Sequence, residues 1–165
     1  MSIQLEQATA DIKMYRTEII DKLMKYTATD MLLFWGTDRE LIAEQQKYWE
    51  PLLKWAEKEF DGNFKKTHGL DVSEENLQSG YRLKAFLERL SDRELAAYYL
   101  AALNMRSVLL AAALVKKQIT AEQAYEAAYL EQLFQEKKWG KDEDAAAKLA
   151  ERKKELYEIE DFLKQ

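Results

Sequence analysis

Side chains that could carry out chemistry are few in this sequence. Cysteine is absent, and the only histidine is His68, in a stretch with the composition of a turn. No E-x-x-H pair is present, so a di-metal helical bundle would lack its ligands. A glycine-rich phosphate loop and a G-x-S-x-G nucleophile elbow are also missing. The sequence therefore predicts no catalytic residue, no metal site and no cofactor.

Two charged residues stand where helical spacing predicts an apolar surface. Glu131 continues a stripe formed by Ala124, Ala128 and Gln135, and Arg106 interrupts the longest apolar run. A buried ion pair between Glu131 and Arg106 would satisfy both charges and fix the register of the two helices. Alternatively, Glu131 lines a groove that binds a partner, or serves as the acid or base of a small helical enzyme. The spacing leaves these alternatives open.

The element that must position these residues is the run from Leu95 to Val115. Only Asn104, Arg106 and Ser107 interrupt its apolar character. A membrane span is rejected, because it would place an arginine near mid-bilayer and expose mainly alanine to lipid. A helix that is apolar on all sides is expected in the protein interior, so this run is predicted to be the buried central helix.

Helical spacing and capping residues predict the elements around this helix. Helices are expected over residues 3–26, 37–60 with a kink or short break at Pro51, 73–90, 120–139 and 142–165. Capping boxes are expected at Thr37 with Glu40, Ser91 with Glu94 and Thr120 with Gln123. Gly140 is expected to end its helix in the left-handed conformation.

One short segment is predicted to be extended. MLLFW, residues 31–35, is continuously apolar and ends at Gly36, so a buried strand is expected, with residues 64–67 as its partner. Trp35, Trp49 and Trp55 fall in or beside apolar stripes and are predicted in the core. The predicted fold over residues 1–165 is a mainly α, single-domain orthogonal bundle of six to seven helices, with at most a minimal two-stranded sheet.

Composition excludes several classes of partner. The 30 acidic and 25 basic side chains give a net charge of −5 without a long block of like charge, so neither nucleic acid nor an anionic membrane is expected as a ligand. The first residues, MSIQLEQATADIK, resemble neither a secretory signal nor a transit peptide. The sequence therefore predicts a soluble, mature chain.

Three segments resemble, in order and spacing, the ATP synthase assembly chaperones of mitochondria and alphaproteobacteria, also called the Atp-twelve family. They are WEPLLKW at 49–55, ITAEQA at 119–124 and LEQLFQ at 130–135, which continues to Trp139 and Gly140. The similarity runs from about Tyr26 to the C-terminus. It implies a non-enzymatic chaperone that binds the free α subunit of the F-type catalytic head and prevents its aggregation. A helical interaction module with another client is the alternative.

The resemblance also implies site residues. The family's acid falls on Glu131, and its following glutamine and Trp-Gly pair fall on Gln135, Trp139 and Gly140, so Glu131, Gln135 and Trp139 are predicted to bind the partner. Two departures affect the electrostatics of that site: Gln132 replaces a second acid, and Arg106 replaces a small residue before Ser107.

Two further expectations follow from the same resemblance. The family's smaller, largely β domain, which precedes the helical one, is expected to be absent from this chain. The compartment is expected to be the bacterial cytoplasm or the mitochondrial matrix.

Overall fold

The computed structural model describes residues 3–68 and 80–165, which form α-helices and one short 3₁₀-helix. The helices are α1 Ile3–Lys25, η1 Met31–Leu33, α2 Arg39–Tyr48, α3 Glu50–Phe60, α5 Tyr81–Arg89, α6 Asp92–Met105, α7 Val108–Val115, α8 Ala121–Ala128, α9 Leu130–Trp139 and α10 Glu143–Lys164. The predicted all-α class is confirmed. The helices are shorter and more numerous than expected, because three predicted helices are each divided in two.

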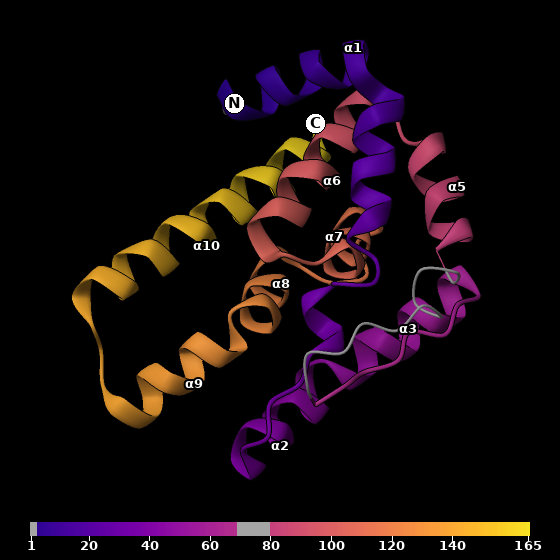
Figure 1. The fold of residues 1–165 in the computed structure, drawn as a ribbon. Helices are drawn as coiled ribbons and strands as arrows, with labels where there is room; N and C mark the ends of the chain where they lie inside the picture. The colour runs from indigo at the N-terminus through magenta and orange to yellow at the C-terminus, as the bar shows by residue number, and fades with distance from the viewer. Residues whose placement is uncertain (1–2, 69–79) are drawn as a thin grey trace.

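The apolar run 95–115 lies in the core, but it is two helices rather than one. Arg106 has φ 55° and ψ 33°, a left-handed conformation that ends α6. Ser107 then starts α7 by accepting a hydrogen bond from the amide of Leu110 at 2.9 Å. The whole of α7 except Val115 is buried, and α6 packs between α1 and α10 (Figure 1). Leu103 and Arg106 are the exposed positions of this run, contrary to the expectation of uniform burial.

The other two divided helices break at aromatic residues that form long-range hydrogen bonds. Trp49 separates α2 from α3, and its indole Nε1 donates to the carbonyl of Ala127 at 2.8 Å. Tyr129 separates α8 from α9, and its hydroxyl donates to the carbonyl of Asn104 at 2.6 Å. The break expected near Pro51 is thus present, with the proline in the first turn of α3, where its missing amide is not needed.

The predicted helix ends are mostly confirmed. Both hydrogen bonds of the capping box are present for Ser91 with Glu94 and for Thr120 with Gln123. The predicted Thr37 cap is wrong, since Asp38 accepts from the amides of Glu40 and Leu41 instead. The helix start predicted at Ser73 lies outside the described residues. Gly140 ends α9 as expected, with φ 95° but with ψ 168°, outside the left-handed helical region.

The strand predicted at residues 31–35 is wrong. Residues 31–33 form η1, because the side chain of Asp30 accepts from the amide of Leu32 at 2.9 Å and turns the backbone. Only Phe34 keeps the predicted pairing, in a single parallel bridge with Thr67. No sheet is present in the described ranges.

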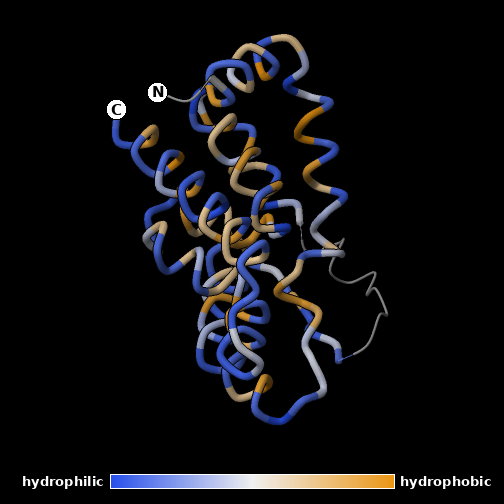
Figure 2. The backbone as a smooth tube through the Cα atoms, turned by 90° about the vertical axis from the view of Figure 1, so that its left-hand side faces the viewer, coloured by the Kyte–Doolittle hydropathy of each residue, from blue (hydrophilic) through white to orange (hydrophobic). Residues whose placement is uncertain are grey.

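Apolar side chains from α1, α3, α5, α8, α9 and α10 converge with α6 and α7 on one core, and α2 packs Ile42 and Tyr48 against it. Figure 2 shows hydrophilic and apolar residues alternating along the outer helices, as expected for helices that bury one face. Trp35 and Trp49 are buried as predicted, and Trp55 is partly buried against the core. In the described part of the chain, no helix is long and apolar enough to span a bilayer.

Two charged side chains stabilise the ends of helices to which they do not belong. Asp30 is buried, and its Oδ2 accepts from the amide of Leu109 at 2.9 Å, at the start of α7. Arg16 donates to the carbonyls of Leu87, Glu88 and Leu90 at the end of α5 and pairs with Asp92 at 2.9 Å. An anion at a helix N-terminus and a cation at a C-terminus both complement the helix dipole.

Asp30 should make stability depend on pH. Burial raises its pKa from 3.8 to about 6, although hydrogen bonds from Leu109, Leu32, Ser107 and Val108 oppose the shift. The native state therefore binds this proton more tightly than the unfolded state. That contribution to stability is complete below about pH 4 and is lost as the pH rises through about 6.

We expect the unfolding free energy of the wild type, measured relative to Asp30→Asn by urea denaturation, to fall by about 2.4 kcal/mol from about pH 4 to about pH 7. Asparagine does not titrate, so the difference between the two proteins isolates this carboxyl. A constant difference would show that the hydrogen bonds cancel the effect of burial on the pKa, and a difference that rises with pH would show that they outweigh it.

Candidate functional site

The predicted site residues lie on α9, the helix that follows the break at Tyr129. Glu131, Gln135 and Trp139 are four residues apart, so they follow one side of α9. All three side chains are exposed, and 75% of Trp139 is accessible to solvent. Leu130 is the residue of α9 that is fully buried. This helix therefore places the three predicted residues in one exposed row.

The buried ion pair predicted between Glu131 and Arg106 is not formed. Both residues are exposed, and no salt bridge joins them among the described residues. The prediction assumed that residues 120–139 form one continuous helix. Because the chain breaks at Tyr129, Ala124 and Ala128 face the core while Glu131 faces solvent. Glu131 lies in the first turn of α9, where the helix dipole favours a carboxylate.

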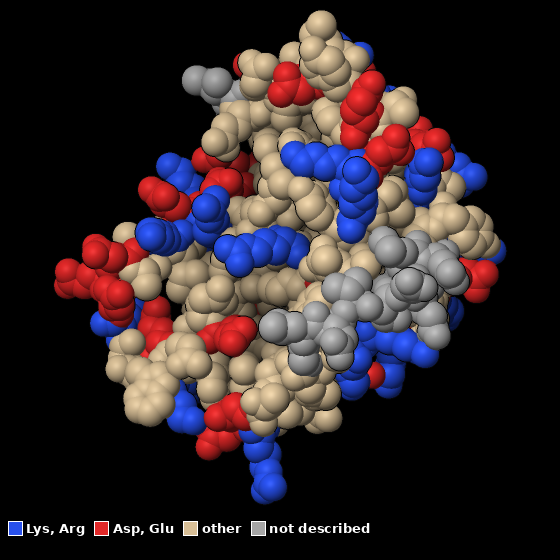
Figure 3. Space-filling view, in the orientation of Figure 1, with Lys and Arg blue, Asp and Glu red and all other residues tan. Residues whose placement is uncertain are grey.

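Two adjoining hollows run along this row. The smaller, of about 270 Å³, is lined by Glu131, and the larger, of about 830 Å³, is lined by Gln135, Trp139 and Gly140. Their shared walls are Arg106, Tyr129, Gln132 and Arg152. We call these two hollows together the α9–α10 groove. Figure 3 shows the surface hollowed between α10 and α9, with charged side chains of both signs along its edges.

The two walls of the groove carry different charges. Glu131 and Glu136 belong to α9, whereas Arg106 ends α6 and Lys148 and Arg152 project from α10. The α10 side also contributes the acids Asp142 and Glu151, and Arg152 pairs with Glu155 at 3.1 Å. The groove therefore has an acidic edge on α9 and an edge of mixed charge on the α6–α10 side.

Tyr129 forms the floor between these edges. Burial raises the pKa of its hydroxyl to about 12, and the charges of Arg152 and Arg106 oppose that rise. The hydroxyl is thus protonated and donates to the carbonyl and the Oδ1 of Asn104, at 2.6 and 2.8 Å. Among the described residues, Glu131 is the only carboxylate that lines the smaller hollow, which it shares with Tyr129.

His68 lies outside the groove and contacts Gly36 and Trp35. Its Nδ1 lies 2.9 Å from the carbonyl oxygen of Gly36, and its ring contacts Trp35 edge to face. Across residues 3–68 and 80–165, no three side chains of histidine, aspartate or glutamate gather as metal ligands would.

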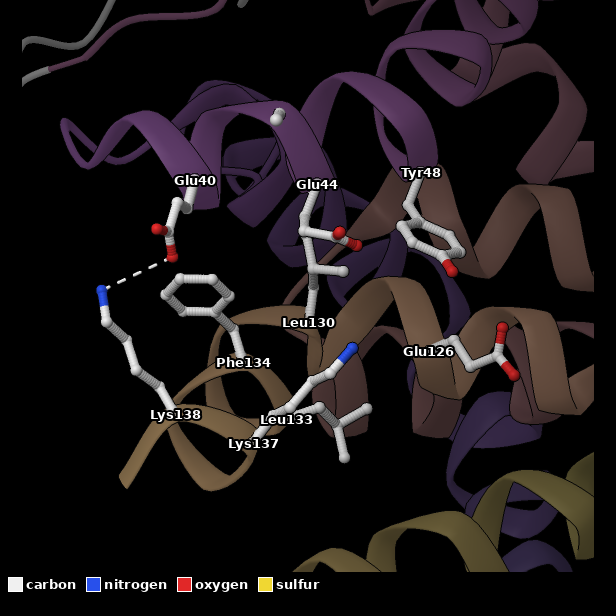
Figure 4. A pocket seen from close by; sticks show the side chains of 10 residues that line it. Glu40, Glu44, Tyr48, Glu126, Leu130, Leu133, Phe134, Lys137 and Lys138 are labelled. Atoms are coloured by element: carbon white, nitrogen blue, oxygen red, sulfur yellow. Dashed lines mark ion pairs between the residues drawn. The ribbon is translucent and has the colours of Figure 1, made fainter. Parts of the chain in front are cut away.

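A separate hollow lies on the other side of α9, and the sequence analysis did not predict it. It has a volume of about 550 Å³ and lies between α2 and α9, where Tyr48, Leu130 and Phe134 give it an apolar lining (Figure 4). Lys138 closes one end by pairing with Asp38 at 3.7 Å and Glu40 at 3.6 Å. The spacing of Leu130, Leu133 and Phe134 signals an apolar stripe, but only the fold shows that α2 faces it.

Comparison with known proteins connects this fold to a family. The model of the family described as ATP12 chaperone protein matches residues 2–57. Crystal structures of Atp12 from Paracoccus denitrificans and of a point mutant of that protein are similar to this chain at 26% identity, with TM-scores of 0.83 and 0.84. Each match covers 92% of this chain and 66% or 65% of the other.

A third similar structure is a candidate chaperone from Agrobacterium tumefaciens, at 25% identity and a TM-score of 0.82, over 93% of this chain and 58% of that one. This chain thus spans less than two thirds of the length of each of these structures. The family match in the N-terminal third and the structural similarity over nearly the whole described fold agree with each other. The chain is therefore similar to the ATP12 chaperone family in the sequence of its N-terminal third and to Atp12 in its fold.

Proposed function

We propose that this chain is an assembly chaperone of the F-type ATP synthase, and that its client is the unassembled α subunit. Similarity to the ATP12 chaperone family supports the general role. The choice of the α subunit rests on the resemblance of the segments 49–55, 119–124 and 130–140 to chaperones with that client. The compartment would be that of ATP synthase assembly, the bacterial cytoplasm or the mitochondrial matrix.

The observation that best supports binding through the α9–α10 groove is the exposed row on α9. A tryptophan that leaves 75% of its side chain in water contributes little to the core, yet tryptophan is enriched among the residues that dominate binding energy at interfaces. Trp139 stands at the end of this row, and Glu131 and Gln135 supply polar groups that orient a partner. The proposed client would bury Trp139.

The proposed mechanism is coverage of a surface without a chemical step. An α subunit without its β partner exposes an interface that favours aggregation. The chaperone would occupy that interface through the indole of Trp139 and the polar row beside it. Binding energy alone would hold the client, so no nucleotide would be consumed. The β subunit would displace the chaperone when it offers a larger complementary surface.

Co-expression with the α subunit from the same genome tests the client directly. We expect the α subunit to co-purify with a tagged form of this chain, because a stable complex forms before the β subunit arrives. Equimolar chain should also suppress the light scattering of purified α subunit without hydrolysing ATP. The β subunit alone, used as the control bait, should not co-purify. An α subunit that aggregates equally with and without the chain would contradict the proposed client.

Substitutions on α9 test the site while leaving the fold intact. We expect Trp139→Ala to weaken α-subunit binding at least thirtyfold, about 2 kcal/mol, because an interface anchor is lost. Met14→Ala is the matched control, since Met14 is 74% exposed and lies outside the groove. Both variants should keep an unfolding free energy within about 0.5 kcal/mol of wild type. Equal binding by the two variants would remove Trp139 from the site.

The carboxylate of Glu131 has its own control. We expect Glu131→Gln to slow association and to reduce the dependence of binding on salt, because an interface charge steers encounter. Glu122→Gln removes an exposed acid from the corresponding first turn of α8 and should leave both measurements unchanged. Stopped-flow binding at two ionic strengths would measure these effects. Identical kinetics for the two variants would show that Glu131 does not face the client.

A further inference from the structure

We propose that Arg106 is a recognition residue that binds a carboxylate, the side chain of an aspartate or glutamate on the client protein. The identity of that client as the α subunit rests on the proposed function. The inference that Arg106 binds a carboxylate of another protein rests on the structure of the junction between α6 and α7.

Arg106 lies where three hollows meet. It lines both parts of the α9–α10 groove and also a third hollow, of about 260 Å³. Leu103 and Tyr26 line that third hollow and are 44% and 38% exposed. Leu103 and Arg106 line both this hollow and the smaller part of the groove, so a partner that spans the two hollows would lie against Arg106.

The backbone that carries this arginine is held firmly. The carbonyl of Arg106 accepts from the amide of Met31 at 3.0 Å. Immediately after it, the side chain of Ser107 caps α7, and the carboxylate of Asp30 accepts from the amide of Leu109. Fixing the base of a side chain before binding lowers the entropy that binding must overcome.

The guanidinium itself is available. Across the described residues, no carboxylate pairs with Arg106 and no acceptor receives a hydrogen bond from it. Its neighbour in the groove, Arg152, is instead paired with Glu155. Glu131 lines the same hollow as Arg106 but forms no salt bridge with it. An arginine presents a planar set of donors that matches a carboxylate with two parallel hydrogen bonds.

The surroundings favour a carboxylate from a protein over a nucleic-acid phosphate. The chain has a net charge of −5, and Glu131 opens into the hollow beside Arg106, so a chain of phosphates would be repelled. A single acidic side chain avoids this repulsion, and its apolar neighbours would cover Leu103 and Tyr26. The client segment is therefore expected to carry one acid flanked by apolar residues.

The backbone of Arg106 allows an informative substitution. Glycine adopts positive φ without strain, so Arg106→Gly removes the guanidinium and should preserve the turn between α6 and α7. Lys117 is the matched control, because it also has positive φ, 60°, also follows a helix end and is also an exposed cation, but it lines none of the three hollows. Circular dichroism melts should show both variants folded as stably as wild type, within a few degrees.

We expect Arg106→Gly to weaken capture of the α subunit about tenfold, because a charge-assisted contact is lost, and Lys117→Gly to leave capture unchanged. Arg106→Lys should retain part of the affinity, since it keeps the charge without the paired donors. Equal capture by wild type and Arg106→Gly would overturn this inference and leave the proposed function standing. Equal losses for both glycine variants would also overturn it, because only net charge would then matter.

A client-independent probe separates this inference from the proposed function. A labelled peptide of alternating glutamate and leucine should bind wild type more tightly than the same peptide with glutamine, by fluorescence anisotropy. Arg106→Gly should abolish that preference, and Lys117→Gly should keep it. If wild type fails to capture the α subunit but prefers the glutamate peptide through Arg106, the proposed client is wrong and the carboxylate site stands. No preference in wild type would overturn the carboxylate site.

Discussion

The carboxylate of Asp30, buried at the start of α7, is the interaction on which the central architecture depends. It accepts hydrogen bonds from the backbone amides of two residues that are distant in sequence, Leu32 in η1 and Leu109 in α7. The first amides of a helix have no carbonyl partner within the helix, and in a buried helix they cannot form hydrogen bonds with water. Asp30 supplies the missing acceptor, even though burial of its charge is costly enough to raise its pKa.

The hydrogen bonds at the start of α7 also determine where Arg106 lies on the surface. Because Asp30 and Ser107 both act at the beginning of α7, the chain must leave α6 sharply, through the left-handed Arg106. The side chain of Arg106 then emerges at the surface rather than along a continuous helix. A constraint that arises from hydrogen bonding in the core thus places a cation in the middle of the candidate binding surface.

Trp49 and Tyr129 direct α9 in a comparable way. The indole of Trp49 is bound to the end of α8, and the hydroxyl of Tyr129 is bound to the end of α6, so the chain between α8 and α9 is held from both sides. The helix that emerges offers one polar face to the α9–α10 groove and one apolar face to α2. Exposed Trp139 sits beside the amine of Lys138, which lies 5.9 Å from its ring. Charged neighbours of this kind let an exposed aromatic ring stay in water without forming a large apolar patch.

The sequence by itself determined the class of fold, the buried segment 95–115, two of the three capping boxes and the positions that resemble the family's motif. These features depend on neighbours three or four residues apart, which periodicity and capping rules describe. Where helices break depended on partners far away in the chain: the left-handed Arg106, the turn at Trp49 and the turn at Tyr129 each coincide with a long-range hydrogen bond. Helical phase restarts at every break, so the exposure of Glu131 could not be predicted from its stripe. Only the tertiary structure placed Glu131 in solvent and showed that, within the described residues, Arg106 has no carboxylate partner.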